Sequence, residues 1–182
     1  MGFVKTELDG VLIYEPKVFS DDRGYFLETY NQNIFKEAGL NYEFVQDNQS
    51  KSCYGVLRGL HYQLDPHAQT KLIRVLKGKI WDVAVDIRTK SPTYKRWVGI
   101  ELSEDNFKQL LVPRGFAHGF VVLANDTVIS YKCDNFYNKG AEGGIRFDDP
   151  ELKIDWRIPA KDVLLSDKDL KNPFLKDARN NF

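Results

Sequence analysis

Short runs of alternating apolar and polar residues follow one another along most of the chain. They are rich in β-branched and aromatic side chains, and turn-forming residues separate them. This pattern predicts ten β-strands, which indicates a sandwich or a barrel. The predicted strands span residues 10–19, 24–30, 42–50, 55–63, 71–78, 79–88, 96–102, 108–113, 116–124 and 127–133. Helical signals are sparse: 31–40 predicts a short helix ending at Gly39, and 166–178 predicts another, interrupted near Pro173.

Two neighbouring strands on either side of Gly78 predict a β-hairpin over residues 71–88. The residues that share a face are Lys71, Ile73 and Val75 before the glycine, and Trp81, Val83, Val85 and Ile87 after it. The segment 116–124 is apolar on both faces, which is typical of a strand between two packed layers. His118 is in phase with the apolar residues of that strand, so we expect it to point into a core or a lined cavity.

The strand VLRGLHYQ (56–63) mixes apolar and hydrogen-bonding groups on both of its faces. Simple alternation places Arg58 with Leu60 on one face and His61 with Leu57 on the other. The strand is therefore either a buried strand with two costly polar groups or the floor of a functional site.

Three predicted strands carry an ionisable or phenolic group on an apolar face, namely Lys71, His118 and Tyr131. A single inward His or Tyr is usually a hydrogen-bonded core residue. A buried lysine is different, because an unpaired ammonium is costly to bury. We therefore expect a polar cavity at Lys71, although its amine could also reach an edge of the sheet.

Composition predicts an ordinary single domain over residues 1–182. The 182 residues are 42% hydrophobic and 29% charged, and the 26 basic side chains balance the 26 acidic ones. This balance argues against a nucleic-acid or membrane-surface partner. Cys53 and Cys133 both fall in apparent strands, where a free cysteine behaves as a small hydrophobe, and they are too few for a disulfide framework. We expect a cytoplasmic protein, because no run approaches transmembrane length or a signal peptide.

Local motifs restrict the chemistry. The stretch VPRGFAHGF (112–120) is similar to the second cupin motif, P-x-G-x-x-H, but the first motif reads His61-Tyr-Gln63 and lacks a second histidine. We therefore expect no metal, although a mixed ligand set stays open. No serine-nucleophile or phosphate-loop motif occurs. Arg23 and Arg58 are the natural phosphate-binding candidates, and Arg23 fits equally well an Asp-Asp-Arg-Gly turn with no binding role.

Taken together, six segments resemble the dTDP-4-dehydrorhamnose 3,5-epimerase family in the right order. They are FSDDRGYFLETY, FVQDNQSKSCYGVLRGLHYQ, KLIRVLKGKIWDVAVDIRTKSPTY, LVPRGFAHGFVVL, VISYKCDNFY and LSDKD, within residues 10–170. The resemblance implies an all-β, cupin-type jelly-roll sandwich with a few short peripheral helices. It also implies a homodimer in which N-terminal strands join the partner's sheet.

The resemblance further implies inversion of C3 and C5 of a dTDP-linked 4-keto-6-deoxyhexose through an enolate, without a cofactor. The implied catalytic residues are His61 as the base, Asp169 as the residue that orients it, Lys71 as the enolate-stabilising cation and Tyr131 as the acid. The implied substrate-binding residues are Arg23 and Arg58 at phosphate, Glu28, Gln46, Asp47 and Asn48 near the nucleotide, Tyr137 as a lining aromatic, His118 near the sugar, and Glu142 and Lys168.

Three alternatives remain open from sequence. A single-carbon epimerase acting on a related nucleotide-linked ketosugar would share the same base. A metal-dependent cupin oxygenase or a non-catalytic sugar-binding module ranks lower, because four acid–base groups exceed what binding alone requires.

Overall fold

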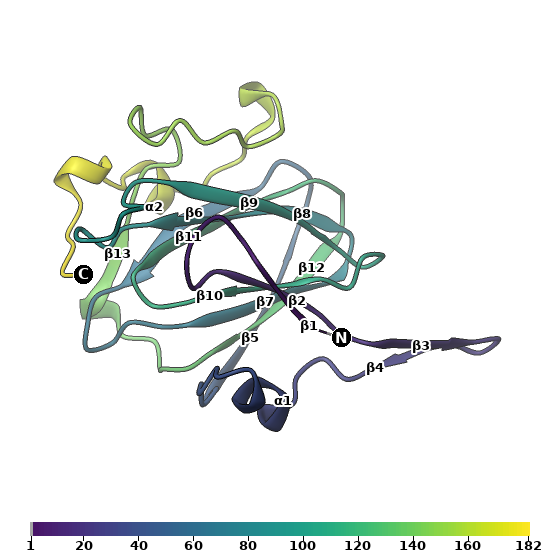
Figure 1. Cartoon of the computed structure of the whole chain (residues 1–182). Helices are drawn as coiled ribbons and strands as arrows, with labels where there is room; N and C mark the ends of the chain where they lie inside the picture. Colours follow the sequence, from purple (N-terminus) through teal and green to yellow (C-terminus); the bar gives the residue numbers. More distant parts are fainter. Residues whose placement is uncertain (1) are drawn as a thin grey trace.

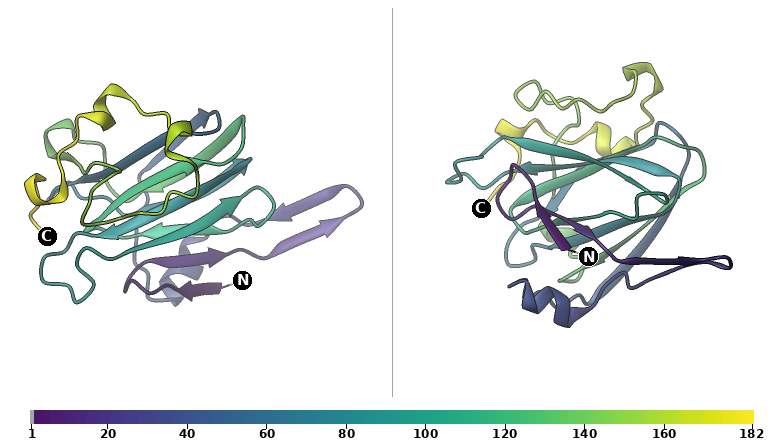
Figure 2. Two further views of the ribbon diagram at one scale, coloured as in Figure 1. Left: turned by 90° about the horizontal axis from the view of Figure 1, so that it is seen from above. Right: turned by 45° about the vertical axis from the view of Figure 1, so that its right-hand side comes forward.

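Two antiparallel β-sheets face each other, as Figures 1 and 2 show. The computed structural model describes residues 2–182. The first sheet contains β1 (Gly2–Lys5), β2 (Leu12–Glu15), β5 (Gln46–Ser52), β7 (Lys71–Lys77), β10 (Gln109–Val112) and β12 (Thr127–Cys133). The second contains β6 (Leu57–Gln63), β8 (Lys79–Asp86), β9 (Trp97–Ser103), β11 (Phe116–Val122) and β13 (Glu142–Gly144). Their orders are β1-β2-β10-β7-β12-β5 and β13-β6-β11-β8-β9, so the predicted all-β sandwich is confirmed.

A separate two-stranded arm extends from the sandwich (Figure 1). It consists of β3 (Val18–Asp21) and β4 (Gly24–Leu27), which pair with each other and not with either large sheet. The sequence predicted one strand over 10–19, but the structure has two, separated at Pro16, which cannot donate to a strand ladder. The predicted helices are short: α1 (Gln32–Glu37) is followed by Gly39, and α2 (Asp167–Leu170) is separated by Pro173 from a 3₁₀ turn at Leu175–Asp177.

The five-stranded sheet is covered on both faces, which explains why strand β11 is buried throughout. One apolar layer fills the space between the sheets and includes Ile73, Ile80, Ala84, Phe116 and Ile129. A second layer lies between the five-stranded sheet and the C-terminal segment, and it includes Leu57, Leu60, Val83, Ile145, Leu152 and Trp156. A third layer packs α1 onto the six-stranded sheet through Tyr14, Phe35, Leu72 and Leu111.

The predicted hairpin over 71–88 is wrong. Strands β7 and β8 are consecutive, but β7 pairs with β10 and β12, whereas β8 pairs with β9 and β11. The chain crosses from one sheet to the other at Gly78, whose φ is +78°. A Cβ there would lie 2.3 Å from Oγ1 of Thr127, so this tight crossing requires glycine.

The two cysteines differ in their environments. Cys133 is buried in β12, as predicted, but Cys53 is exposed in the turn after β5, so its prediction as a buried strand residue is wrong. Strand β5 ends at Ser52, and the chain then turns at Tyr54 and Gly55, where the φ of Gly55 is +85°. Both thiols are free.

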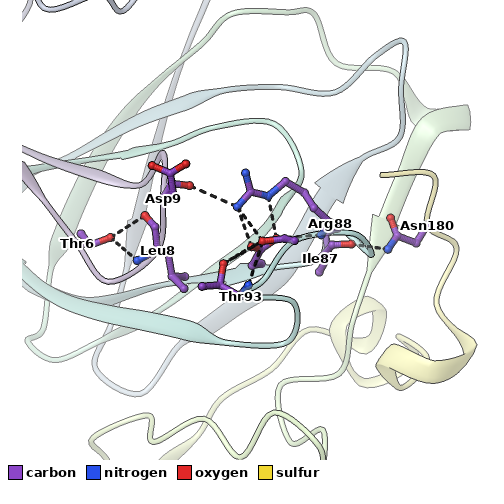
Figure 3. A network of polar contacts seen from close by, with 9 residues as sticks. Thr6, Leu8, Asp9, Ile87, Arg88, Thr93 and Asn180 are labelled. Carbon is purple, nitrogen blue, oxygen red and sulfur yellow. Dashed lines mark hydrogen bonds and ion pairs between the residues drawn. The ribbon is translucent and has the colours of Figure 1, made fainter.

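A polar network joins the end of β8 to the C-terminal tail (Figure 3). The fully buried Asp86 carboxylate accepts hydrogen bonds from Arg88 Nε at 2.9 Å and from Thr93 Oγ1 at 2.6 Å. The amide of Asn180 donates to the carbonyl oxygen of Ile87 at 2.6 Å. Burial raises the pKa of Asp86, but these hydrogen bonds outweigh burial and lower that pKa to about 2. The network therefore depends on an ionised carboxylate.

Candidate active site

Two adjoining cavities lie between the sheets and share His61, Lys71 and Tyr131 in their walls. Their volumes are about 380 and about 280 Å³. The first is completed by Tyr62 and by the polar side chains Gln46, Asn48, Gln63, Gln69, Tyr137 and Glu142. The second is completed by Ser50, Arg58, His118, Phe120, Ser166, Lys168 and Asp169. The four predicted catalytic positions thus lie around one hollow, to which both sheets and α2 contribute.

His61 of β6 is paired with a carboxylate from the distant helix α2. Its Nε2 lies 2.5 Å from Oδ1 of Asp169, a residue that is 4% exposed. Ser166 caps α2, donating its hydroxyl to Asp169 Oδ2 at 2.8 Å and accepting the Asp169 backbone N–H at 3.1 Å. Burial raises the pKa of Asp169, but hydrogen bonds from His61 and Ser166 and nearby positive charge outweigh burial and lower it. The carboxylate is thus ionised and both its oxygens are occupied.

Arg58 and His61 line the same cavity although simple alternation places them on opposite faces. The phase changes at Gly59, whose φ is +127° and where the pairing of β6 with β11 is irregular. A Cβ at Gly59 would lie 2.5 Å from Cα of Gly119, so the close approach of the two strands requires glycine. This irregularity explains why both faces of the strand look mixed in sequence. Leu57 and Leu60 pack in the layer between the five-stranded sheet and the C-terminal segment, whereas Arg58 and His61 face the cavity.

A second imidazole–carboxylate pair lies beside the first. His118 of β11 is directly opposite His61 in the strand register, so both side chains project from the same face of the sheet. His118 Nε2 lies 2.6 Å from Oδ1 of Asp82, on the neighbouring strand β8. The Asp82 side chain is completely buried.

Lys71 and Tyr131 approach from the opposite sheet. They lie on the adjacent strands β7 and β12, and the Lys71 amine makes no hydrogen bond or ion pair with any residue between 2 and 182. Burial lowers the pKa of Lys71, and the nearby Cys133, Asp82 and Glu142 oppose this decrease. Burial raises the pKa of the Tyr131 phenol, which therefore stays protonated at neutral pH.

Hydrogen bonds and an ion pair link polar residues that line the two cavities. Glu142 of β13 forms an ion pair with Lys168 of α2, and the Tyr137 hydroxyl donates to the same carboxylate at 3.3 Å. Burial raises the pKa of Glu142, but the hydrogen bond and charge of Lys168 outweigh burial and lower it. On the other wall, Gln46 donates to Asn48 at 3.0 Å and accepts the Tyr137 backbone N–H at 3.1 Å.

Three predicted binding residues lie away from these cavities in this chain. Asp47 points to the outer face of its sheet and pairs with Lys132, because its neighbours on β5 take the inward positions. Arg23 lies on the β3–β4 arm, is 90% exposed, and pairs with Asp21. Glu28 follows the arm and accepts a hydrogen bond from Asn31 at 3.0 Å.

Among the residues missed from sequence, Asp82 and Ser166 hold predicted site residues directly by hydrogen bonds. Asp82 alternates with Ile80 and Ala84 of the inter-sheet layer, and that pattern alone could have identified an inward carboxylate. Ser166 stands three residues before Asp169, which is the spacing of a helix N-cap.

Residues 2–182 contain no group of three or more His, Cys, Asp or Glu side chains arranged to hold a metal ion. None of their helices has the length and apolar composition needed to cross a membrane.

This arrangement is suited to proton transfer. It combines an imidazole oriented by a carboxylate, an unpaired amine and a protonated phenol around a cavity of ligand size. A base, a cation and an acid are what removal and return of a proton beside a carbonyl group require. The fold and the site thus define a jelly-roll enzyme of acid–base isomerisation.

Comparison with known proteins specifies the family. The family model described as dTDP-4-dehydrorhamnose 3,5-epimerase matches residues 5–177. A dTDP-4-dehydrorhamnose 3,5-epimerase of Shigella flexneri is 54% identical over 179 residues, which are 98% of each chain. The crystal structure of the Elizabethkingia anophelis enzyme superposes with a TM-score of 0.94 at 58% identity, covering 97% of both chains.

A third comparison is with a ligand complex. The dTDP-6-deoxy-D-glucose-3,5-epimerase of Legionella pneumophila, solved with dTDP-4-keto-L-rhamnose, has a TM-score of 0.93 at 45% identity. The alignment covers 97% of this chain and 93% of that one. The chain belongs to the dTDP-4-dehydrorhamnose 3,5-epimerase family, and the resemblance found in the sequence is confirmed.

Proposed function

We propose that the protein inverts C3 and C5 of dTDP-4-dehydro-6-deoxyglucose and so forms dTDP-4-dehydrorhamnose. The observation that carries this proposal is the His61–Asp169 pair, which lines a cavity together with Lys71 and Tyr131. Both carbons flank the C4 ketone, so loss of a proton from either gives an enolate that can be reprotonated on the opposite ring face. The protein is an isomerase in which one group of residues serves both positions.

His61 is the proposed base. Its Nε2 contacts the ionised Asp169, which fixes the hydrogen on that nitrogen and leaves Nδ1 to accept the proton from carbon. Asp169 then stabilises the imidazolium that forms. The electron pair of the broken C–H bond moves to the C4 oxygen as the enolate forms.

Lys71 and Tyr131 are proposed to complete each inversion. The Lys71 ammonium stabilises the enolate oxygen, and such prearranged charge contributes several kcal/mol in a site with little water. The Tyr131 phenol returns a proton to the other face of the carbon, a role for which its raised pKa keeps it protonated. Solvent then restores the proton to Tyr131 and removes the one held by His61.

The two adjoining cavities are assigned to different parts of the substrate. We assign the diphosphate to Arg58 and Lys168. Both line the cavity of about 280 Å³, and guanidinium and ammonium groups bind phosphate oxygens. The amides of Gln46 and Asn48 and the exposed ring of Tyr137 suit the hydrogen-bonding edge and the face of a nucleobase. His118 lies beside the sugar, and Lys168 would exchange Glu142 for a phosphate oxygen.

A homodimer gives Arg23 and Glu28 a role in this proposal. The β3–β4 arm exposes Phe19, Tyr25 and Phe26 and extends away from its own sandwich, as Figure 2 also shows. We propose that it joins a second copy, where Arg23 contacts the diphosphate and Glu28 the nucleotide. We propose that each chain forms one domain over residues 1–182, because the His61–Asp169 pair joins β6 to the distant α2. We also propose that the protein is cytoplasmic, and its two free cysteines support this.

Complementation tests the role of the arm. Arg23→Ala and His61→Ala homodimers are each expected to be impaired, but mixed dimers should regain activity. In a mixed dimer, the site that retains His61 would receive Arg23 from the other copy. If Arg23 served its own chain, mixing would restore nothing.

Hydrogen exchange tests the reaction itself. Incubation with dTDP-4-dehydro-6-deoxyglucose in deuterated water should place deuterium at C3 and C5, as measured by NMR. No exchange at either carbon would defeat the proposal, and exchange at C3 alone would select a single-carbon epimerase. A binding module predicts that His61→Ala changes nothing, and a metal-dependent oxygenase predicts stoichiometric metal by elemental analysis.

A further inference from the structure

Asp82 is a buried carboxylate beside the cavity to which the mechanism gives no role. Its side chain is 0% exposed, and Oδ1 contacts His118 Nε2 at 2.6 Å. Its other oxygen, Oδ2, is buried and has no hydrogen-bond partner in the described chain. An ionisable group that is buried and only half satisfied is costly for stability, so its presence beside an active site requires an explanation.

Strand register places Asp82 within the site rather than behind it. Asp82 is opposite Phe120, His118 is opposite His61, and Phe120 is in turn opposite Arg58. Because cross-strand partners project from the same face, Asp82 belongs to the inward face that carries both histidines. The sheet therefore presents two imidazole–carboxylate pairs side by side, one with the base and one without an assigned function.

The charge of Asp82 also acts on Lys71, which lies on the opposite sheet. The negative charge of Asp82 favours the ammonium form of Lys71, against the burial that disfavours it. His118 is fixed by Oδ1 with a hydrogen on Nε2, which leaves Nδ1 free to contact a ligand. One carboxylate thus acts on two groups that surround the proposed enolate.

We propose that Asp82 is a positioning residue of the epimerase, which acts through His118 and Lys71 to keep positive charge and a hydrogen-bonding group beside the C4 oxygen. This inference rests on the proposed function. Asp82 itself contacts no substrate: its Oδ1 orients the His118 ring, and its charge holds the proton on Lys71. Loss of that charge would leave the cavity shape intact but weaken stabilisation of the enolate.

The charged and titratable groups around Lys71 define what else can affect its titration. They are Cys133 and Tyr131 on β12, Asp82 on β8, His118 on β11, His61 and Arg58 on β6, Glu142 on β13, and Lys168 and Asp169 at α2. Of the carboxylates, Asp169 is occupied by His61 and Ser166, and Glu142 by Lys168 and Tyr137. Asp82 is the one with a free oxygen.

Asp82→Asn is the decisive variant, because the amide oxygen can still accept from His118 while the charge is removed. Its matched control is Asp86→Asn, on the same strand, equally buried and outside the cavities. The first measurement is competitive acetylation of Lys71 against pH, followed by peptide mass spectrometry. Asp82→Asn should lower the pKa of Lys71, and Asp86→Asn should leave it unchanged.

The second measurement is the pH dependence of kcat and KM for epimerisation. In Asp82→Asn, the alkaline limb of kcat should move to lower pH, and kcat at neutral pH should fall by about 10- to 100-fold with KM changed less than about threefold. If the Asn variant does not fold by circular dichroism, Asp82→Ser is the second variant, with the same expected directions. An unchanged Lys71 titration, or a shift that Asp86→Asn reproduces, overturns the proposal.

Failure of the proposed function would appear differently. Acetylation needs no substrate, so it reports the coupling between Asp82 and Lys71 even in a protein that catalyses nothing. A wild-type protein that exchanges hydrogen at neither C3 nor C5 defeats the proposed function. An active wild type with an unshifted Lys71 in Asp82→Asn defeats the role of Asp82 alone.

Discussion

His61 and His118 are direct cross-strand partners on β6 and β11, and each pairs its Nε2 with a different buried carboxylate. The carboxylates come from different elements: Asp169 from helix α2 and Asp82 from strand β8. Only His61 is substantially accessible, with 30% of its side chain exposed against 9% for His118. This difference in access favours His61 as the base and His118 as a fixed wall of the site.

Asp169→Asn should reduce kcat by about 10²- to 10⁴-fold, with a small effect on KM. The amide can donate to Nε2 and so stabilise the wrong tautomer of His61, whose Nδ1 then carries hydrogen and cannot accept a proton. Steady-state kinetics and deuterium exchange measure the effect. A loss below about tenfold would show that the pair seen in the structure does not orient the base.

Tyr131→Phe and His61→Ala should separate the two proton transfers. Without the phenol, His61 still removes and returns a proton on its own face, so exchange with solvent continues while inversion is lost. Without the imidazole, both exchange and inversion fall by about 10²-fold or more. NMR of the recovered sugar distinguishes them, and equal residual exchange in both variants would contradict this division.

Ser166→Ala should lower both stability and rate, by different amounts. The hydroxyl caps α2 and holds Asp169 Oδ2, so its loss should cost about 1 kcal/mol of unfolding free energy and about tenfold in kcat. Ser166→Thr keeps both hydrogen bonds and serves as the control. Urea unfolding and steady-state kinetics compare the two variants. If Ser166→Thr were as impaired as Ser166→Ala, the hydroxyl group would not be the cause of the loss.

The Asp86 network predicts a specific loss of stability in acid. The folded-state pKa of Asp86 is about 2, below its ordinary value of 3.8, so its contribution is complete above about pH 4 and is lost as pH falls towards 2. The shift corresponds to roughly 2 kcal/mol. Urea unfolding should show this loss in the wild type between about pH 4 and pH 2, and a weaker pH dependence in Asp86→Asn.

Asp155→Asn is the surface control for this prediction. Asp155 pairs with Arg157 on the exterior, where both side chains are more than half exposed. Its replacement should change the unfolding free energy by less than about 0.5 kcal/mol at any pH tested. An identical acid profile in wild type and Asp86→Asn would show that other carboxylates control acid unfolding.

The sequence by itself determined most of the strands and three of the polar groups that turn inward. The two-residue repeat of a strand is local, so Lys71, His118 and Tyr131 could be assigned to apolar faces before their neighbours in space were known. The family resemblance then brought His61 and Asp169 into the same hypothesis. Their contact across 108 positions of the chain could not follow from any local pattern.

Only the tertiary structure decided which strands meet. Consecutive strands on either side of Gly78 look like a hairpin in sequence, yet they belong to opposite sheets because strand partners are chosen by long-range packing. The irregularity at Gly59 likewise places Arg58 and His61 on one face, whereas strict alternation would place them on opposite faces. Alternation along β8 could have placed Asp82 on the inward face, but its pairing with His118 beside His61 is decided by the register of three strands rather than by the order of residues along one of them.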